Sequence, residues 1–246
     1  GYLACGYEGK GRLPDPEKIL EAVQGLLRKK DLAGEKILIT AGPSREPLDP
    51  VRYITNRSSG KMGYALARAA LHRGAEVVLV SGPTALAAPA GARVIAVNTA
   101  SEMRAVTVHE FTRCTIAIMA AAVADYRPAH AASKKIKKGA TAVQVQLEPN
   151  PDILKELGAI KDGKFLVGFA AETEDLSLNA TKKLHAKNLD MIVANDVTLE
   201  GSGFDSDSNT AAILDRSGTT RTLPLMTKKE LADEILDHMI ALKAKG

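Results

Sequence analysis

The segment GKMGYALARAALHRGAEVVLVSGP, residues 60–83, contains the pattern from which the fold class can be predicted. Its first part predicts a helix over residues 60–73 that Gly74 closes, and EVVLVS at residues 76–81 predicts a strand followed by a Gly-Pro turn. Another strand, KILIT at residues 36–40, precedes the helix and also runs into a Gly-Pro turn. Strands that alternate with helices through short Gly-ended turns are typical of a parallel sheet covered by helices.

The same alternation continues along the rest of the chain. Residues 115–121 (TIAIMAA) are almost continuously apolar, as expected of a strand that is buried on both faces. Residues 210–214 and 221–223 flank the turn-rich residues 215–218 and predict a terminal hairpin. Further strands are predicted at residues 93–97, 143–147, 165–169 and 191–194, and further helices at residues 15–30, 101–112 (with Ser101 and Glu102 at its capped start), 152–157, 176–187 and 228–242.

Length and composition suit one globular domain with or without appendages. The chain has 246 residues, of which 45% are hydrophobic and 25% charged, and its net charge of +4 fits either nucleic acid or anionic metabolites as ligands. The two cysteines and five histidines show neither a disulfide framework nor the spacing of a metal site. Because no apolar run approaches the roughly 18 residues of a membrane span and no signal peptide opens the chain, we expect a cytoplasmic protein without membrane contact. Gly1 in place of an initiating Met indicates a piece of a longer protein.

A polar loop of small residues leads directly into the helix predicted at residues 60–73. Such loops present backbone N–H groups to phosphate, so Ser58, Ser59 and Gly60 form a candidate anion-binding loop. Just upstream, Arg52 and Asn56 add a cation and an amide, which suit a carboxylate or phosphate ligand. A plain Gly-Ser turn that caps the helix is the structural alternative.

This loop matches neither of the common phosphate-binding motifs. A dinucleotide-binding turn should follow the first strand immediately, yet about eighteen residues separate Thr40 from Ser58. A P-loop needs Ser or Thr after Gly-Lys, where this chain has Met62. The loop therefore predicts an anion site of another kind.

Two further loops follow predicted strands. AAAVADYRP at residues 120–128 has small residues that allow a ligand close to the backbone, and Asp125 could hold a metal ion or a ribose unless it is a simple turn residue. Residues 134–138 contain four lysines, which predict a mobile lid over a polyphosphate or, alternatively, a solvated loop. Because no aromatic residues interleave these lysines, nucleic acid is the weaker candidate ligand.

More polar positions follow the later strands. Asn150-Pro151-Asp152-Ile153 opens a helix, with Asn150 or Asp152 as its cap, and Phe169 lies at the end of a strand. Lys183 and Lys187 share one helical face because they are four residues apart. Each feature alone suits a structural role, but together they predict a site at the carboxyl edge of the sheet.

Residues 49–63, DPVRYITNRSSGKMG, resemble the signature of bacterial phosphopantothenate–cysteine ligases. The resemblance covers about residues 34–240, in the right order, through residues 120–128, 135–138, 150–154, 168–173 and 194–196. The leading Leu3-Ala4-Cys5-Gly6 resembles the last loop of phosphopantothenoylcysteine decarboxylases, which bacteria usually fuse ahead of the ligase. The resemblance thus implies a decarboxylase tail with a linker helix at residues 1–33 and a ligase domain at residues 34–246.

For the fold, the resemblance implies a Rossmann-like, mostly parallel sheet flanked by helices, with a lysine-rich flap and a C-terminal hairpin plus helix. For the activity, it implies that CTP and 4'-phosphopantothenate form an acyl-cytidylate with release of pyrophosphate. The amine of L-cysteine then displaces CMP, and Mg²⁺ assists by neutralising charge on the phosphates. A homodimer is also implied, in which a loop of one subunit completes the site of its neighbour.

The family's functional positions can be carried over to individual residues. Asn56 and Arg52 match positions at the substrate carboxylate and acyl intermediate, and Lys135 matches a lysine that supports activation. Asp125 is the candidate contact to Mg²⁺, and Cys5 matches the proton donor of the decarboxylase, whose FMN domain is missing from this chain. The nucleotide-contacting positions are Ala121, Asp125, Lys135, Asn150, Pro151, Asp152, Ile153, Phe169, Lys183 and Lys187. The family commonly has Thr at the position of Ser44, which keeps the hydroxyl group.

Two rival functions make different demands on the sequence. An NAD(P)-dependent reductase needs a Gly-rich turn directly after Thr40 and an acidic residue at the end of the second strand, which instead ends at Ser81-Gly82-Pro83. An RNA-binding module would use residues 134–138 and would bind polynucleotides with a steep salt dependence. The sequence offers anion-binding groups but no nucleophile–base pair, which favours electrostatic catalysis on a nucleotide-activated acid. The choice of CTP over ATP rests on the resemblance alone.

Overall fold

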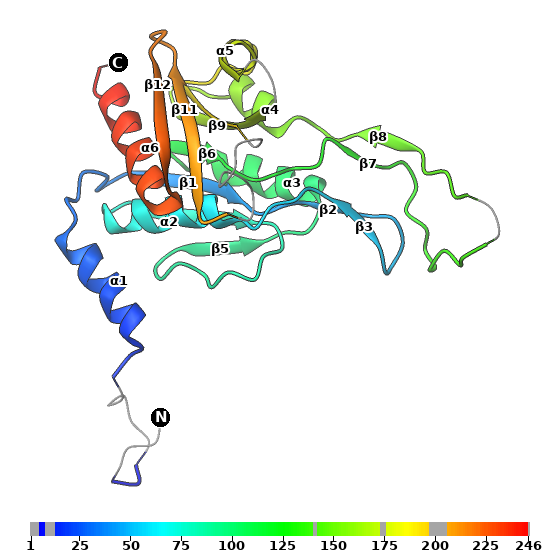
Figure 1. Cartoon of the computed structure of the whole chain (residues 1–246), viewed down its shortest axis with the longest axis horizontal. Coiled ribbons are helices and arrows are strands. Elements are labelled where there is room, and N and C mark those ends of the chain that lie inside the picture. Colours follow the sequence, from blue (N-terminus) through cyan, green and yellow to red (C-terminus); the bar gives the residue numbers. More distant parts are fainter. Residues whose placement is uncertain (1–4, 8–12, 140–141, 173–175, 197–205, 246) are drawn as a thin grey trace.

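The computed structural model of the protein describes residues 5–7, 13–139, 142–172, 176–196 and 206–245. The strands of its central sheet are β1 (Lys36–Ala41), β4 (Glu76–Ser81), β5 (Arg93–Ala96), β6 (Ile116–Met119), β9 (Phe165–Glu172), β10 (Met191–Asp196), β11 (Ser208–Asp215) and β12 (Thr220–Thr227). The helices are α1 (Pro16–Leu27), α2 (Lys61–His72), α3 (Ala100–Phe111), α4 (Ile153–Ala159), α5 (Leu176–Ala186) and α6 (Lys228–Lys243). The strands form one eight-stranded sheet in the order β12-β11-β10-β9-β6-β1-β4-β5 (Figure 1).

The topology of this sheet confirms the predicted α/β class. The strands from β5 to β10 run parallel, and β11 and β12 form an antiparallel hairpin that α6 follows. From β5 to β10, the parallel strands lie in the order 3-2-1-4-5-6 of their succession along the chain, which is a common order of doubly wound nucleotide-binding folds. The order reverses between β1 and β6, and ligands in such sheets bind in the crevice outside this switch point.

Helices cover both faces of the sheet, because successive strand residues point to opposite sides. In β1, Ile37 and Ile39 pack into a core with α2 and α6, whereas Leu38 packs into a second core with α3, α4 and α5. Every residue of β6 is buried, as its apolar sequence predicts. These two cores fix the carboxyl ends of the strands and therefore the loops that follow them.

The helix caps explain where the helices begin, and one predicted cap is wrong. Thr99, not Ser101, is the N-cap of α3, since its side chain accepts a hydrogen bond from the N–H of Glu102 and the Glu102 carboxylate accepts one from the N–H of Thr99. The same reciprocal arrangement joins Thr227 and Glu230 at the start of α6. The threonines satisfy the free N–H groups of the first turns, so both helices start directly after them.

Two small hairpins project from one side of the sheet (Figure 1). β2 (Arg45–Pro47) pairs with β3 (Tyr53–Thr55), and β7 (Tyr126–Pro128) pairs with β8 (Leu147–Pro149). We call residues 45–55, 126–139 and 142–149 the arm. The strand predicted at residues 143–147 is wrong, because only its last residue belongs to β8 and its apolar side chains are exposed by 40–60%. No core lies next to this stretch, so its alternating pattern has no face to bury.

The N-terminal helix α1 is shorter than the helix predicted at residues 15–30 and leads away from the sheet (Figure 1). Its predicted apolar face contains Leu26 and Leu27, which are 80% and 82% exposed. This face therefore contributes little to the core of the domain. Within the described part of the chain, no helix has both the length and the apolar character that crossing a membrane requires.

Candidate functional site

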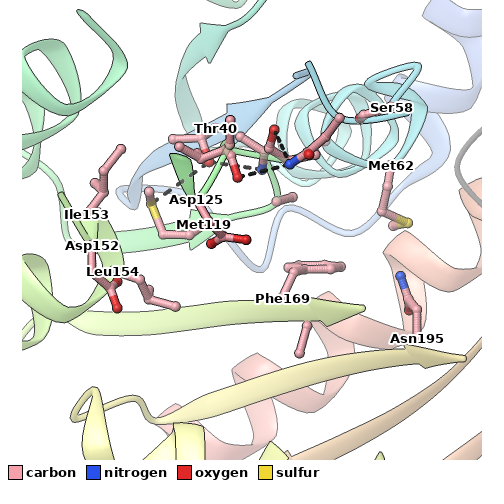
Figure 2. Close-up of a pocket in the computed structure, with 18 of the residues that line it drawn as sticks. Thr40, Ser58, Met62, Met119, Asp125, Asp152, Ile153, Leu154, Phe169 and Asn195 are labelled. Atoms are coloured by element: carbon pink, nitrogen blue, oxygen red, sulfur yellow. Dashed lines mark hydrogen bonds between the residues drawn. The ribbon is translucent and has the colours of Figure 1, made fainter. Parts of the chain in front are cut away.

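A cavity of about 760 Å³ lies at the carboxyl ends of the parallel strands (Figure 2). Thr40 of β1 and Met119 of β6 line it from the two sides of the switch point, and Phe169 of β9 and Asn195 of β10 continue the wall. Its volume lies within the roughly 300–1,000 Å³ typical of small-molecule sites. Its position is the one that the strand order predicts for a ligand.

Most of the site residues predicted from the sequence line this one cavity, and a few do not. The lining includes Asn56, Ser58, Gly60, Ala121, Asp125, Asn150, Pro151, Asp152, Ile153, Phe169, Lys183 and Lys187. Arg52, Ser59 and Lys135 are not among the lining residues. Cys5 is exposed in the N-terminal segment, whereas Leu3 and Ala4 of the same motif lie outside the described residues, as does Thr173.

One end of the cavity is formed by the start of α4 and one face of α5. Asp152 is the N-cap of α4, since its carboxylate accepts a hydrogen bond from the N–H of Lys155 at 3.0 Å. It also pairs with the ammonium group of Lys187 at 2.9 Å. Burial acts to raise the pKa of Asp152, but the Lys155 N–H and the Lys187 charge outweigh it and lower the pKa. This end therefore combines an ionised carboxylate with a nearby cation.

The loop after β6 is held by hydrogen bonds to Thr40 of β1, to Ser44 after β1 and to Asn56 after β3. The Thr40 hydroxyl accepts from the N–H of Ala121 at 3.2 Å, and the Ser44 hydroxyl accepts from the N–H of Ala124 at 3.0 Å. The amide nitrogen of Asn56 donates to the carbonyl of Val123 at 3.0 Å. These bonds fix small residues in the cavity floor, where a ligand can approach the backbone closely.

Asn150 closes the same floor from the opposite side. Its amide nitrogen donates to the carbonyl of Ala124 at 2.8 Å, and its backbone N–H donates to the carbonyl of Asp125 at 2.8 Å. The Oδ1 atom of Asn150 is buried and has no hydrogen-bond partner among the described residues. Because an unpaired buried acceptor costs roughly 1–3 kcal/mol, such an atom is typical of a position that a ligand satisfies.

The first turn of α2 forms another part of the wall. Gly60 precedes it as the N-cap with φ at +79° and, being glycine, makes no side-chain capping hydrogen bond. The first turn also carries no acidic residue. The positive end of the helix dipole therefore faces the cavity, which favours an anion, although the Asp207 carboxylate pairs with the Lys61 ammonium group at 2.7 Å.

Arg52 does not converge with Asn56 on the helix mouth, contrary to the sequence prediction. Its guanidinium group bonds to the buried carboxylate of Asp49, with Nε at 3.1 Å, and donates to the carbonyl of Ile136 at 2.7 Å. The N–H of Ile136 donates to Asp49 at 3.0 Å, so the lysine-rich residues 134–138 are tied to the β2–β3 hairpin within the arm. The Arg52 hydrogen bond lowers the pKa of Asp49 far below its usual range, although burial opposes this shift.

The described residues contain no group of three or more His, Cys, Asp or Glu side chains that could hold a metal ion by themselves. Asp125 nevertheless lines the cavity with an exposed carboxylate. Mg²⁺ commonly keeps several waters and binds through one or two carboxylates together with substrate phosphates. Asp125 fits this kind of shared coordination.

Several lining residues are absent from the predicted site. Thr40, Lys61, Met62, Asn195, Asn209 and Lys228 all reach the cavity. Asn195 lies in a stretch that carries the resemblance, but Asn209 and Lys228 follow the parallel part of the chain. Asn209 in β11 and Lys228 at the start of α6 become neighbours of the site because β11 pairs with β10, which the sequence pattern does not specify.

The strand order, the cavity at the switch point and its cationic and amide lining define a ligand-binding domain of the doubly wound α/β class. Comparison with known families gives a more specific assignment. The chain belongs to the family described as DNA/pantothenate metabolism flavoprotein C-terminal domain, whose model matches residues 32–242.

Individual relatives agree with this assignment. The chain is 48% identical to the coenzyme A biosynthesis bifunctional protein CoaBC of Bacillus subtilis over 246 residues, which cover 98% of this chain and 61% of that protein. It thus spans about three fifths of the length of that relative. The crystal structure of a CoaBC C-terminal domain superposes with a TM-score of 0.77 at 44% identity, covering 89% of this chain and all of that one. A Cab2 mutant in complex with phosphopantothenate-cysteine shares the fold, with a TM-score of 0.68 at 16% identity over 95% of this chain and 96% of that one.

Proposed function

We propose that this domain joins 4'-phosphopantothenate to L-cysteine with CTP, as its resemblance to phosphopantothenate–cysteine ligases implies. First, a carboxylate oxygen of phosphopantothenate attacks the α-phosphorus of CTP, and the bond to the β-phosphate breaks. Pyrophosphate leaves, and an acyl-cytidylate remains. Next, the cysteine amine attacks the acyl carbon and loses a proton while CMP departs, which gives 4'-phosphopantothenoylcysteine.

One observation carries this proposal: the expected nucleotide-contacting positions, except Lys135, gather around a single cavity. Asn150, Asp152 and Lys187 lie at one end of it, and Ser58 and Gly60 approach it at the start of α2. These positions are far apart in the sequence, so the fold alone makes them neighbours. The similarity to CoaBC proteins, described as coenzyme A biosynthesis proteins, supports the same activity.

The chain's own groups act in this proposal by binding and orienting the reactants. Asn56, which bonds to the loop after β6, orients the acyl group, while Lys183 and Lys187 contact the nucleotide. Asp125 would hold Mg²⁺ together with the substrate phosphates, and a metal ion bound there would supply positive charge to the phosphate groups. Lys135 of the flap stabilises the departing pyrophosphate.

The decisive experiment measures pyrophosphate release from CTP, ATP, GTP and UTP with phosphopantothenate, with and without cysteine. We expect CTP to be the best substrate and release to require phosphopantothenate. Cysteine should be needed for CMP to appear but not for a first turnover of pyrophosphate. Absence of release with every nucleotide would contradict the ligase function, and a preference for ATP would contradict only the choice of nucleotide.

We further propose that the protein forms a homodimer through the arm. Val51, Tyr53, Tyr126, Val143 and Leu147 are exposed by 45–60%, and all of them belong to the arm. Exposed apolar patches of this kind are typical of interaction surfaces. Arg52 and Lys135 also lie on the arm and outside the cavity of their own chain. A second copy seated on the arm could receive these cations into its own site.

Mixing of inactive variants tests this arrangement. Arg52→Ala and Asn56→Asp should each be inactive, but if Arg52 acts on the neighbouring site, mixed dimers contain one intact site. An equal mixture should therefore recover about a quarter of the wild-type activity after subunit exchange. No recovery, with mixed dimers demonstrated, would place Arg52 in its own subunit's site. A monomer by light scattering would contradict the dimer itself.

Other expectations belong to the same proposal. Residues 1–33 would be a decarboxylase tail and linker, with Cys5 serving an FMN-binding decarboxylase domain ahead of it, and residues 34–246 would be the ligase domain in the cytoplasm. The family match beginning at residue 32 and the partial coverage of bifunctional CoaBC relatives support these boundaries. A ligand-binding assay with FMN should find no affinity in this chain.

A further inference from the structure

Lys187 reaches the cavity from the end of α5, although it follows Ala186, the last residue of that helix. Its ammonium group lies 2.9 Å and 3.2 Å from the two carboxylate oxygens of Asp152. A lysine side chain is a flexible four-carbon stem, so the position of its charge depends on how firmly its backbone is held. The residues that hold the backbone of Lys187 therefore help to determine where this charge lies in the cavity.

The end of α5 has the two hydrogen bonds of a Schellman motif, which fixes the backbone on both sides of Lys187. The N–H of Leu189 donates to the carbonyl of Leu184 at 2.9 Å, and the N–H of Asn188 donates to the carbonyl of His185 at 3.2 Å. Asn188 has φ at +54°, the left-handed conformation that this motif requires. Apart from glycine, asparagine is among the few residues that adopt it readily. Leu184 and Leu189 are also buried in the same core, which anchors the motif.

The side chain of Asn188 ties this motif to two other elements. Its amide nitrogen donates to the carbonyl of Gly158, in the last turn of α4, at 2.7 Å. Its amide oxygen accepts a hydrogen bond from the guanidinium group of Arg216, in the turn between β11 and β12, which also donates to the carbonyl of Leu189. Asn188 thus joins α5 to α4 and to the C-terminal hairpin, and it is not among the residues that line the cavity.

Gly158 permits this contact because it has no side chain. A Cβ atom at Gly158 would lie 1.9 Å from the carbonyl oxygen of Lys187 and 2.9 Å from its carbonyl carbon. Because Cβ atoms essentially never come within 3.0 Å of another atom, a larger residue would push the ends of the two helices apart by about 1 Å. Glycine is a poor helix former, and this close approach explains its presence inside α4.

Lys187 therefore lies along α4, with its backbone near the end of that helix and its charge at the start. Its carbonyl group lies against Gly158, whereas its ammonium group reaches Asp152, six residues earlier and about 9 Å away along the helix axis. A displacement of the α5 end relative to α4 must therefore move the ammonium group relative to Asp152.

We propose that Gly158 and Asn188 are positioning residues for Lys187, because their contact sets where its ammonium group meets a ligand in the cavity. The inference rests on the proposed function, in which Lys187 contacts the nucleotide. Neither positioning residue touches the cavity itself, so both act through the lysine.

Calorimetric titration with CTP tests this proposal in a double-mutant cycle of Gly158→Ala and Lys187→Met. Lys187→Met should weaken CTP binding about tenfold, because a hydrogen bond from a charged group is lost. Gly158→Ala should weaken it about fivefold or more alone, but less than about twofold when Lys187 is already replaced. Equal losses in both backgrounds, or no loss in either, would overturn the proposal.

Gly25→Ala is the matched control for the substitution. Gly25 is also a helical glycine, but it does not line the cavity, and a Cβ atom there would meet only the side chain of His72, at 3.1 Å. We expect this variant to bind CTP as the wild type does. A loss equal to that of Gly158→Ala would show that the effect does not come from the contact with Lys187.

The pKa of Asp152 provides a second readout, which needs no nucleotide. Burial acts to raise this pKa, whereas the Lys155 N–H and the Lys187 ammonium group lower it. In a pH titration followed by carbon-13 NMR, the pKa should rise in Lys187→Met and by a similar amount in Gly158→Ala. A rise in Lys187→Met alone would overturn the proposal, because a glycine that only permits helix packing would change the unfolding temperature without moving this pKa.

Asn188→Ala provides the same two tests if Gly158→Ala does not fold, as judged by thermal unfolding. Alanine loses the amide bond to Gly158 and is strained in the left-handed conformation, so we expect weaker CTP binding and a raised Asp152 pKa. Asn188→Gly restores the backbone conformation and should recover part of both. Wild-type values in Asn188→Ala would overturn the proposal. A wild-type protein that binds no CTP would contradict the proposed function, whereas the Asp152 pKa would still decide whether Gly158 and Asn188 position Lys187.

Discussion

Replacement of Gly63 by alanine tests whether the close approach of α2 to β1 shapes the cavity. A Cβ atom at Gly63 would lie 2.6 Å from the Cβ of Ala41, 3.0 Å from the carbonyl oxygen of Thr40 and 3.1 Å from the Cα of Ala41. None of these atoms is the end of a flexible side chain that could move aside. The first turn of α2 must therefore move away from β1, and the backbone N–H groups that face the cavity move with it.

The expected magnitude follows from two opposing effects. Overpacking of this kind costs about 1–3 kcal/mol, whereas alanine is a better helix former than glycine by roughly 0.5–1 kcal/mol. We expect the free energy of unfolding to fall by about 1–2 kcal/mol on balance, which lowers the midpoint of thermal unfolding by about 2–8 °C in a domain of this size. Because the helix mouth is displaced, affinity for CTP should fall about tenfold or more.

Differential scanning calorimetry and CTP titration of Gly63→Ala measure both effects. Ala65→Gly, in the same helix, is the control that reports the cost of glycine without a steric clash at β1. Gly63→Ser should be at least as destabilising as Gly63→Ala, since it adds an atom at the same contact. If Gly63→Ala unfolds at the wild-type temperature or above and binds CTP normally, the approach of α2 to β1 does not constrain the cavity.

Four further predictions concern the arm, the metal and the two half-reactions. Asp125→Asn should impair CTP use more at limiting than at saturating Mg²⁺ in steady-state kinetics, and an equal loss at both would point to a ribose contact or a structural role. The pKa of Asp49 is depressed below its ordinary value of 3.8, so its ion pair with Arg52 should stabilise the arm above that pH and lose its effect only as the pH falls toward the lower folded-state pKa. Proteolysis of the arm should therefore be fast at neutral pH in Asp49→Asn but not in the wild type. Equal rates would show that Asp49 does not hold the arm in place. Cys5→Ser should leave ligation unchanged in a coupled assay, and a loss beyond a few-fold would show that the N-terminal segment is wrongly assigned. Lys135→Gln should slow pyrophosphate release by about 10²–10³ even without cysteine. Asn56→Asp should still release some pyrophosphate and should accumulate acyl-cytidylate in quench experiments with labelled CTP. A stall of both variants at the same step would contradict this division of roles.

The sequence by itself determines the local elements of this protein. The strand predicted at residues 76–81 is β4 without a change of boundary, because its continuous apolar run, rich in valine, has no helical periodicity and glycines flank it on both sides. The helix that precedes it is also predicted to within about one residue, since an apolar face and a closing glycine are both local signals. Alternation of such elements is enough to predict a parallel sheet with helices on both faces.

Local signals fail where burial depends on distant partners. Residues 143–147 alternate apolar and polar side chains like a strand, but they lie on the arm, where no core covers them. Arg52 lies only four residues before Asn56 in the sequence, yet Asp49 and Ile136 hold its guanidinium group away from the cavity. A sequence pattern reports the spacing of side chains, and it does not report which groups are available to pair with them.

Only the tertiary structure determines which residues come together to form the site. The sequence places Asn56 and Asp152 in separate loops and Lys187 on a helical face near the carboxyl edge of the sheet, and the strand order brings them around one cavity. Lys228 has no local signal, because it begins α6 and reaches the cavity only through the antiparallel pairing of β11 with β10. Which loops meet is decided by the order of the strands in the sheet, and that order depends on the packing of both cores together rather than on any single stretch of sequence.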